Sequence, residues 1–286
     1  MRTERWIILA SLWAVVAGGC ARMNRDPADC FLPETDVERY EHGLVVCLSG
    51  AGGMMGETGN IRQGLIDGGV ECAIEVFDWS TGVVLIDQMD LEANKRKARA
   101  LARRVEEYQQ GYPGRPVHLV GVSAGTGLIV WALEDLAPGC HVESAFLIAP
   151  SLWHKYDLSD AMQELEGRLY TFYSPWDPVL ALLVPVFGTV DRINGVSGGL
   201  GGFSPPDKAD GRTKAVYESK LEQIGWESED AVYGHIGGHL GATQPAYVSA
   251  RIAPLLNRGT PATDTVGSSV AGRARRHAVM VALGPL

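Results

Sequence analysis

The sequence predicts an α/β protein in which a mostly parallel sheet lies between two layers of helices. Short, nearly continuous apolar runs recur along the chain, and segments with helical periodicity separate them. Continuous apolar strands are typical of a sheet buried on both faces, and therefore of parallel pairing. The regular alternation of strand and helix then indicates three layers. No internal repeat interrupts this pattern.

The composition limits the classes of protein that fit. The 286 residues suit one large domain or two small ones, and a content of 46 % hydrophobic and 21 % charged residues excludes a disordered chain. A formal charge of −9 argues against a nucleic-acid binder. Glycine is in excess, with 35 residues. Either tight functional turns or low-complexity loops explain such an excess.

The N-terminus has the pattern of a secretory signal peptide over residues 1–19. Arg2 and Arg5 precede the apolar run Trp6–Ala17, and small residues follow it. Twelve residues span only about 18 Å as a helix, which is too short for a bilayer core of roughly 30 Å. A transmembrane anchor is therefore not expected.

Cys20 directly follows this segment, which resembles a bacterial lipoprotein signal. The resemblance implies lipidation of Cys20, export, and attachment to a membrane of the cell envelope. Ala17 departs from the leucine that such signals prefer three residues before the cysteine. An ordinary signal peptide, giving a secreted or periplasmic soluble protein, stays open as the alternative. The polar residues 20–41 are expected to form a tether.

The folded domain is expected over residues 42–257. Its predicted strands are Gly43–Leu48, Glu71–Phe77, Pro116–Val120, Val142–Ile148 and Arg168–Tyr173, with a last one near Glu229–Tyr233. Its clearest predicted helices are Leu91–Gln110, Ala124–Leu136 and Gln244–Leu256. Residues 187–212 hold seven glycines and are expected to form a surface loop. Residues 258–286 are expected to form a low-complexity tail.

One motif carries chemistry. Gly121–Gly125 matches G-x-S-x-G, follows a predicted strand and opens a predicted helix. A nucleophile elbow requires this strand-turn-helix setting, which presents the serine hydroxyl at a helix N-terminus. Gly195–Gly199 also matches, but neither a strand precedes it nor a helix follows it. Ser123 is therefore the predicted nucleophile, and Ser197 is predicted to be a loop residue.

With this motif in this setting, residues 43–256 resemble the α/β-hydrolase superfamily. The resemblance implies an esterase or lipase that uses a Ser-His-Asp triad and an acyl-enzyme intermediate, with thioesterase or peptidase activity as variants. No insertion between Leu136 and Arg168 resembles a cap domain. The apolar run Val179–Phe187 fits either an acyl pocket or a core helix.

The resemblance implies an acid and then a histidine after the nucleophile. Asp177 follows the strand Arg168–Tyr173 and matches the acid, although a turn aspartate that bonds its own backbone has the same pattern. Asp157 and Asp160 are alternatives that precede this strand. His239, just before Leu240–Gly241 and a predicted helix, matches the histidine. His235 is the other candidate.

The oxyanion hole of this superfamily takes one backbone donor from the residue after the nucleophile, here Ala124. The segment Ser49–Met55 resembles the superfamily's H-G-x-G turn, with serine in place of histidine. This alignment makes Ala51 the second donor. Gly50 and Gly52 stay as alternatives.

Two other functions compete with this interpretation. A non-catalytic envelope lipoprotein would use the same fold for binding. A dinucleotide-dependent oxidoreductase is loosely suggested by Gly50–Gly53 followed by Glu71 or Glu75, but the G-x-G-x-x-G spacing fails. No metal or cofactor is predicted, because the sequence has no CxxC, HExxH, P-loop or EF-hand pattern. The expected partners are an ester substrate and, through the lipid anchor, a membrane.

Overall fold

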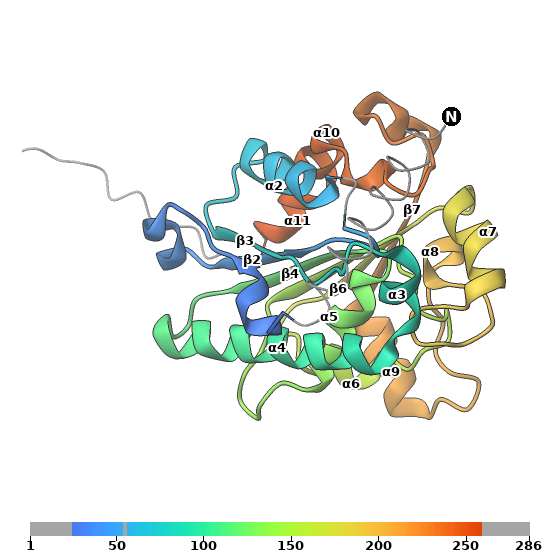
Figure 1. Cartoon of the computed structure of the whole chain (residues 1–286), viewed down its shortest axis with the longest axis horizontal. Coiled ribbons are helices and arrows are strands. Elements are labelled where there is room, and N and C mark those ends of the chain that lie inside the picture. Colours follow the sequence, from blue (N-terminus) through green and yellow to red (C-terminus); the bar gives the residue numbers. More distant parts are fainter. Residues whose placement is uncertain (1–24, 54–55, 259–286) are drawn as a thin grey trace, which may run out of the picture.

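The computed structural model describes residues 25–53 and 56–258 (Figure 1). A seven-stranded sheet with the order β1-β3-β2-β4-β5-β6-β7 forms its centre. Only β1 runs antiparallel to its neighbour, and all other pairs are parallel. The predicted α/β architecture with a mostly parallel sheet is confirmed. The signal peptide, Cys20 and the tail from residue 259 lie outside the described residues.

The strands occupy the apolar runs of the sequence, with one exception. They are β1 (Phe31–Leu32), β2 (Leu44–Leu48), β3 (Ala73–Phe77), β4 (Val117–Val122), β5 (Ser144–Ile148), β6 (Leu169–Tyr173) and β7 (Leu221–Gly225). The last strand, β7, is not where it was predicted. Glu229–Tyr233 lies instead in a 3-10 helix, η3 (Ser228–Tyr233), whose start is fixed by a capping box between Glu227 and Asp230. β7 escaped prediction because it is a partly exposed edge strand with polar residues.

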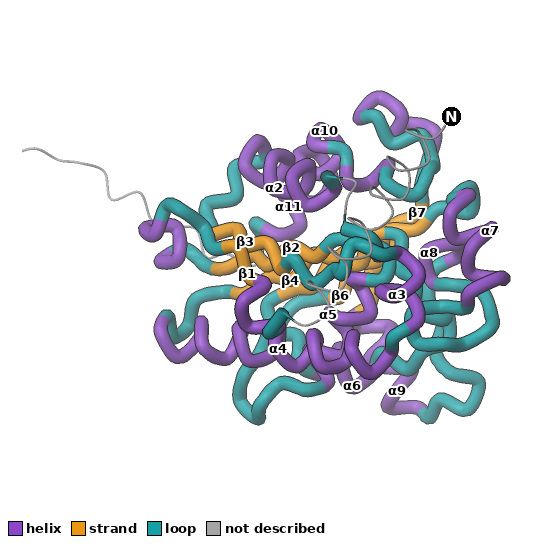
Figure 2. Tube along the Cα trace, in the orientation of Figure 1, coloured by secondary structure: helices purple, strands orange, loops and turns teal. Residues whose placement is uncertain are grey.

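Helices cover both faces of the sheet (Figures 1 and 2). One face carries α2 (Glu57–Asp67), α10 (Pro245–Tyr247) and α11 (Ala253–Leu256). The other carries α4 (Leu91–Gly111), α5 (Gly125–Glu134), α6 (Ser159–Gln163) and α9 (Gly211–Lys220). Three further helices, α3 (Val84–Met89), α7 (Pro178–Phe187) and α8 (Gly198–Gly201), lie together at one end of the sheet.

Side-chain alternation in β2 divides the interior into two cores. Leu44, Val46 and Leu48 pack with the α4 and α5 layer, whereas Val45 and Cys47 pack with the α2 and α11 layer. Every residue of β2 is buried, as parallel strands between two helix layers require. The continuous apolar runs in the sequence are the direct result of this two-sided burial.

Helix α4 follows the predicted periodicity. Asp90 accepts a hydrogen bond from the Ala93 amide and caps its N-terminus, while Ala98, Leu101 and Val105 are buried. The predicted helix Gln244–Leu256 is instead broken into α10, a π-helical turn (η5, Val248–Ile252) and α11. Pro254 cannot donate a backbone hydrogen bond, which accounts for the irregular turn before it.

Two expectations about loops need correction. Residues 25–41 do not form a free tether, because Cys30 and Tyr40 are buried and β1 pairs with β3. Residues 187–212 are not wholly a surface loop either. Ser197 is buried, forms an isolated bridge with Trp153, and stands at the N-cap of α8. Apolar content alone did not reveal this burial, because glycines pack here by close backbone approach.

The four cysteines in the described part of the chain are free thiols. Burial raises the pKa of Cys47 to about 12, so this thiol behaves as a core residue. Within residues 25–53 and 56–258, no helix is both long and apolar enough to cross a bilayer.

Candidate active site

Ser123 stands on a strained turn between β4 and α5. Its φ of +52° lies in the left-handed region, which residues other than glycine rarely adopt. Backbone contacts hold the turn. The Ser123 amide donates to Ile148 O at 2.9 Å, and the Ser123 carbonyl accepts from the amides of Thr126 (3.1 Å) and Ser151 (3.2 Å) and from Thr126 Oγ1 (2.5 Å). The serine therefore keeps a strained conformation that its surroundings determine.

The glycines of the motif are required by close packing. A Cβ atom at Gly125 would lie 2.3 Å from the carbonyl oxygen of Ser49, and one at Gly121 would lie 2.7 Å from Ile129 Cδ1. The first contact is with backbone, so no side-chain rotation relieves it. The elbow and the loop after β2 are thus pressed together, which places Ser49–Gly53 beside the nucleophile.

Asp177 and His239, the predicted acid and histidine, lie in direct contact. Asp177 lies in the turn between β6 and α7 and is 1 % exposed. Its Oδ2 lies 2.6 Å from Nδ1 of His239. Its Oδ1 accepts hydrogen bonds from the amides of Val179 (2.9 Å) and Leu180 (3.0 Å) and caps α7. Asp177 is therefore both the turn aspartate and the partner of a histidine.

The alternative residues lie elsewhere. His235 is buried, its Nδ1 accepts from the Gly237 amide at 3.3 Å, and its ring packs against Tyr247. This burial lowers the pKa of His235. Asp157 and Asp160 are exposed, and Asp157 bonds Ser159 in a local turn. The structure brings His239, and none of these, to Asp177.

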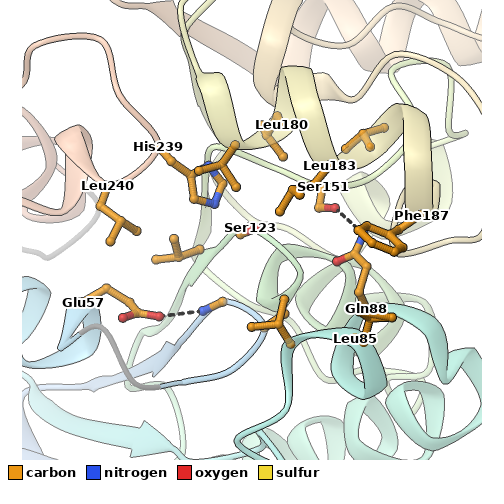
Figure 3. A pocket seen from close by; sticks show the side chains of 16 residues that line it. Glu57, Leu85, Gln88, Ser123, Ser151, Leu180, Leu183, Phe187, His239 and Leu240 are labelled. Carbon is orange, nitrogen blue, oxygen red and sulfur yellow. Dashed lines mark hydrogen bonds between the residues drawn. The ribbon is translucent and has the colours of Figure 1, made fainter.

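Ser123 and His239 line one cavity of about 220 Å³ (Figure 3). No hydrogen bond joins their side chains in the part of the chain that the structure describes, and such bonds are often long in ligand-free enzymes. The apolar residues that line the cavity are Val84, Leu85, Val122, Val179, Leu180, Leu183, Val184, Phe187 and Leu240. They come mostly from α3 and α7. The run Val179–Phe187 thus forms a wall of the cavity.

A hydrogen-bonded polar pair lies within this lining, which also includes the carboxylate of Glu57. Gln88 Nε2 donates to Ser151 Oγ at 2.9 Å (Figure 3), and it also donates to the carbonyl of Gly188 at 3.0 Å. These bonds tie α3 to the end of α7 and to the segment after β5. The width of the cavity is therefore set by packing and by a fixed polar contact.

The loop after β2 distributes its amides unequally. The Gly50 amide donates to Glu57 Oε1 at 3.0 Å, and the Gly52 amide donates to Asp87 Oδ2 at 2.9 Å. The amides of Ala51 and Ala124 have no hydrogen-bond partner among the described residues. Ala51 also lines the cavity that holds Ser123. Of the three amides considered for the second oxyanion donor, Ala51 is thus the one left free.

The fold is similar to that of a solved structure. Aspergillus fumigatus lipase B matches with a TM-score of 0.52 and 13 % identity over 81 % of this chain. The match covers 57 % of the lipase, so the chain spans less than two thirds of that enzyme's length. The chain has the α/β-hydrolase fold. At this identity the likeness establishes the fold alone.

Two bacterial structures match less closely. Esterase B from Lactobacillus rhamnosis has a TM-score of 0.44 at 12 % identity, covering 91 % of this chain and 96 % of its own. A lipase-esterase related protein from Clostridium acetobutylicum has a TM-score of 0.45 at 9 % identity, covering 80 % and 98 %. The sequence itself matches no protein-family model and no curated protein.

In an α/β-hydrolase fold the elbow stands at the carboxyl edge of the sheet, where loops from several strands meet. Four residues that the sequence did not single out lie at this edge: Glu57, Asp87, Gln88 and Ser151. No sequence signal marks them, because their function depends on contacts between separate elements. Among the described residues, no group of three or more His, Cys, Asp or Glu side chains is placed to hold a metal ion.

Proposed function

We propose that the protein is a serine hydrolase that cleaves carboxylic esters. The observation that carries the proposal is the 2.6 Å contact between Asp177 and His239, whose ring faces the same cavity as Ser123 on its strained elbow. A buried carboxylate at Nδ1 fixes the tautomer that leaves Nε2 free to accept a proton, and it stabilises the imidazolium. These groups together are suited to acyl transfer.

In the proposed reaction, His239 takes the proton of Ser123 as Oγ attacks the ester carbonyl. The Ala51 and Ala124 amides stabilise the resulting oxyanion. Collapse of this intermediate expels the alcohol, which receives the proton from His239, and leaves an acyl group on Ser123. Water, deprotonated by His239, then attacks the acyl-enzyme and releases the carboxylic acid.

The cavity favours an ester with an apolar acyl chain. Most of its lining side chains are aliphatic. The others are Phe187, Glu57, the pair formed by Gln88 and Ser151, and the proposed catalytic residues Ser123 and His239. Burial of one methylene group contributes about 0.8 kcal/mol, so each carbon that fits the cavity strengthens binding severalfold. A cavity of about 220 Å³ suits a short or medium acyl chain.

A fluorophosphonate probe tests the proposal. We expect covalent labelling at Ser123, together with hydrolysis of p-nitrophenyl butyrate, and both should be lost in Ser123→Ala. Ser197→Ala is the matched control and should keep both. Labelling that survives Ser123→Ala would refute the assignment. Binding of fatty acid without labelling or turnover would instead identify a binding protein. Parallel assays of a thioester and a peptide substrate would separate the remaining hydrolase variants.

We further propose that the protein is exported and anchored to a membrane of the cell envelope through a lipid on Cys20. The support is the basic start, the short apolar run and the small residues before Cys20. Mass spectrometry of the native N-terminus tests this. A mature chain that begins at Cys20 with added acyl mass is expected, and a mature chain that begins beyond residue 20 would refute it.

A further inference from the structure

Two buried carboxylates lie on either side of the loop Ser49–Gly53. Glu57, the first residue of α2, is 3 % exposed, and Asp87, on α3, is 1 % exposed. Neither has a part in the proton transfers proposed above. Burying a carboxylate is costly unless hydrogen bonds compensate it. Their position therefore calls for a physical explanation.

Each carboxylate holds one amide of the loop. Glu57 Oε1 accepts from Gly50 at 3.0 Å, and Asp87 Oδ2 accepts from Gly52 at 2.9 Å. The amide between them, that of Ala51, has no hydrogen-bond partner among residues 25–53 and 56–258. The amides of Gly50 and Gly52 are thus occupied by carboxylates, and the amide of Ala51 between them remains available as a donor.

The support of Asp87 extends beyond the loop. Its carboxylate also accepts from Ser80 Oγ (2.6 Å), from the Thr81 amide (2.9 Å) and from Thr81 Oγ1 (2.8 Å). Lys97 Nζ lies 4.0 Å from it. Four hydrogen bonds and a cation compensate the charge of Asp87 and hold its side chain in place. They also reduce its electrostatic repulsion of an oxyanion nearby.

The other side of the loop is fixed as well. Trp79 Nε1 donates to the carbonyl of Ser49 at 2.9 Å, and a Cβ at Gly50 would lie 3.2 Å from Ser123 Cβ. Glu57 Oε1 holds the amide of this same Gly50. The position of the loop relative to the nucleophile is thus determined between Trp79, Glu57 and Asp87.

We infer that Glu57 and Asp87 are positioning residues that hold the amides flanking Ala51, so that the Ala51 N–H is presented as the second oxyanion donor. This inference rests on the proposed esterase function. Glu57 acts as a hydrogen-bond acceptor in this role, and its charge is not required. A glutamine at position 57 supplies the same acceptor oxygen. An alanine leaves the Gly50 amide without its hydrogen-bond acceptor, so the loop is free to change its conformation.

The test compares Glu57→Ala, Glu57→Gln and Asp87→Asn by ester hydrolysis at saturating and limiting substrate. Loss of one oxyanion donor lowers kcat by about 100-fold or more. We expect a loss of this order for Glu57→Ala with KM within about threefold, because the apolar side chains of α3 and α7 that line the acyl cavity are unaltered. Glu57→Gln should recover most of that loss. Asp87→Asn should also lower kcat, because both oxygens of Asp87 accept hydrogen bonds and an asparagine keeps only one acceptor atom, so either Gly52 or Thr81 loses its partner.

A second readout separates positioning from a general structural effect. A trifluoromethyl ketone bearing the substrate's acyl chain forms an oxyanion adduct with serine, so its inhibition constant should rise by the factor by which kcat/KM falls. The inhibition constant of the carboxylic acid product should not change. Glu92→Ala is the matched control, because Glu92 also lies in the first turn of a helix but is exposed. It should match the wild type.

The outcomes discriminate between explanations. Wild-type or higher kcat in Glu57→Ala would overturn the inference and would indicate that Gly50 itself donates to the oxyanion. If Glu57→Ala does not fold, as judged by circular dichroism, Asp87→Asn decides by the same criteria, and unchanged kcat there overturns the inference. Absence of Ser123-dependent turnover in the wild type refutes the proposed function. Intact turnover in the variants refutes the positioning role alone.

Discussion

Replacing Gly125 by alanine should slow catalysis while leaving the fold in place. The new Cβ atom would lie 2.3 Å from the carbonyl oxygen of Ser49, about 0.7 Å closer than real Cβ atoms come to any neighbour. The opposing atom belongs to the backbone of the loop that carries Ala51. Either this loop or the elbow must therefore move by several tenths of an ångström.

The cost of this movement follows from the geometry. A displacement of about 1 Å between catalytic groups lowers a rate by about 100-fold. We therefore expect kcat for p-nitrophenyl butyrate to fall by about 10- to 100-fold, as roughly 0.7 Å of movement implies. Overpacking of this kind costs about 1–3 kcal/mol of unfolding free energy, which urea denaturation measures.

Gly59→Ala is the matched control, because Gly59 lies in α2 and a Cβ atom there would have no neighbour within 4 Å. That variant should keep the wild-type kcat. Its free energy of unfolding should rise by about 0.5–1 kcal/mol, because alanine stabilises a helix more than glycine does. A Gly125→Ala protein with kcat within about twofold of the wild type would refute the close approach of elbow and loop as a determinant of catalysis.

Three other parts of the structure can be tested in the same way. Asp177→Asn should lower kcat by about 10⁴-fold, because asparagine favours the wrong tautomer of His239. Leu183→Trp, which fills the cavity from α7, should reduce kcat/KM for an octanoyl ester at least about 10-fold relative to an acetyl ester. Burial lowers the pKa of His118 to about 3, so the unfolded chain takes up a proton below about pH 6.5 that the folded protein excludes. The free energy of unfolding should consequently fall as the pH drops from about 6.5 towards 3, and this fall should be shallower in His118→Gln.

Each of these has a result that would contradict it. Near-normal kcat in Asp177→Asn would return the acid role to another residue. An unchanged acyl-chain preference in Leu183→Trp would show that the chain binds away from α7. For His118, urea unfolding of the wild type and of His118→Gln at about pH 7 and pH 5 measures how much stability each protein loses on acidification. Identical losses would exclude His118 as the cause.

The fold was largely predictable from the sequence, for a physical reason. Buried parallel strands must be apolar throughout, so β2 to β6 are visible in the sequence as runs. The elbow could be recognised in the sequence by its two glycines, which are required because a larger residue would collide with the following helix or with the adjoining loop. Asp177 and His239 were predicted from a resemblance to a family, and the strand expected before His239 is a 3-10 helix in the structure. The 2.6 Å contact between Asp177 Oδ2 and His239 Nδ1 depends on the tertiary structure, and their positions in the sequence could only suggest it.

The remaining features depend on contacts that no local pattern records. Glu57 looks like an ordinary first-turn glutamate, and Asp87 lies inside an apolar stretch, yet both reach the same loop from different helices. Ser197 has a favourable motif and lies buried away from the cavity. Edge strand β7 lacks the apolar run because one of its sides is exposed.

Asp177 uses its two oxygens for two different tasks, and this has a consequence for how the site can change. One oxygen holds His239, and the other caps the helix whose side chains line the acyl cavity. An acid moved to a neighbouring strand could still orient the histidine, but it would leave α7 uncapped and its wall displaced. In the proposed esterase, proton transfer and the choice of acyl chain therefore depend on the same residue, so a change at Asp177 would alter both.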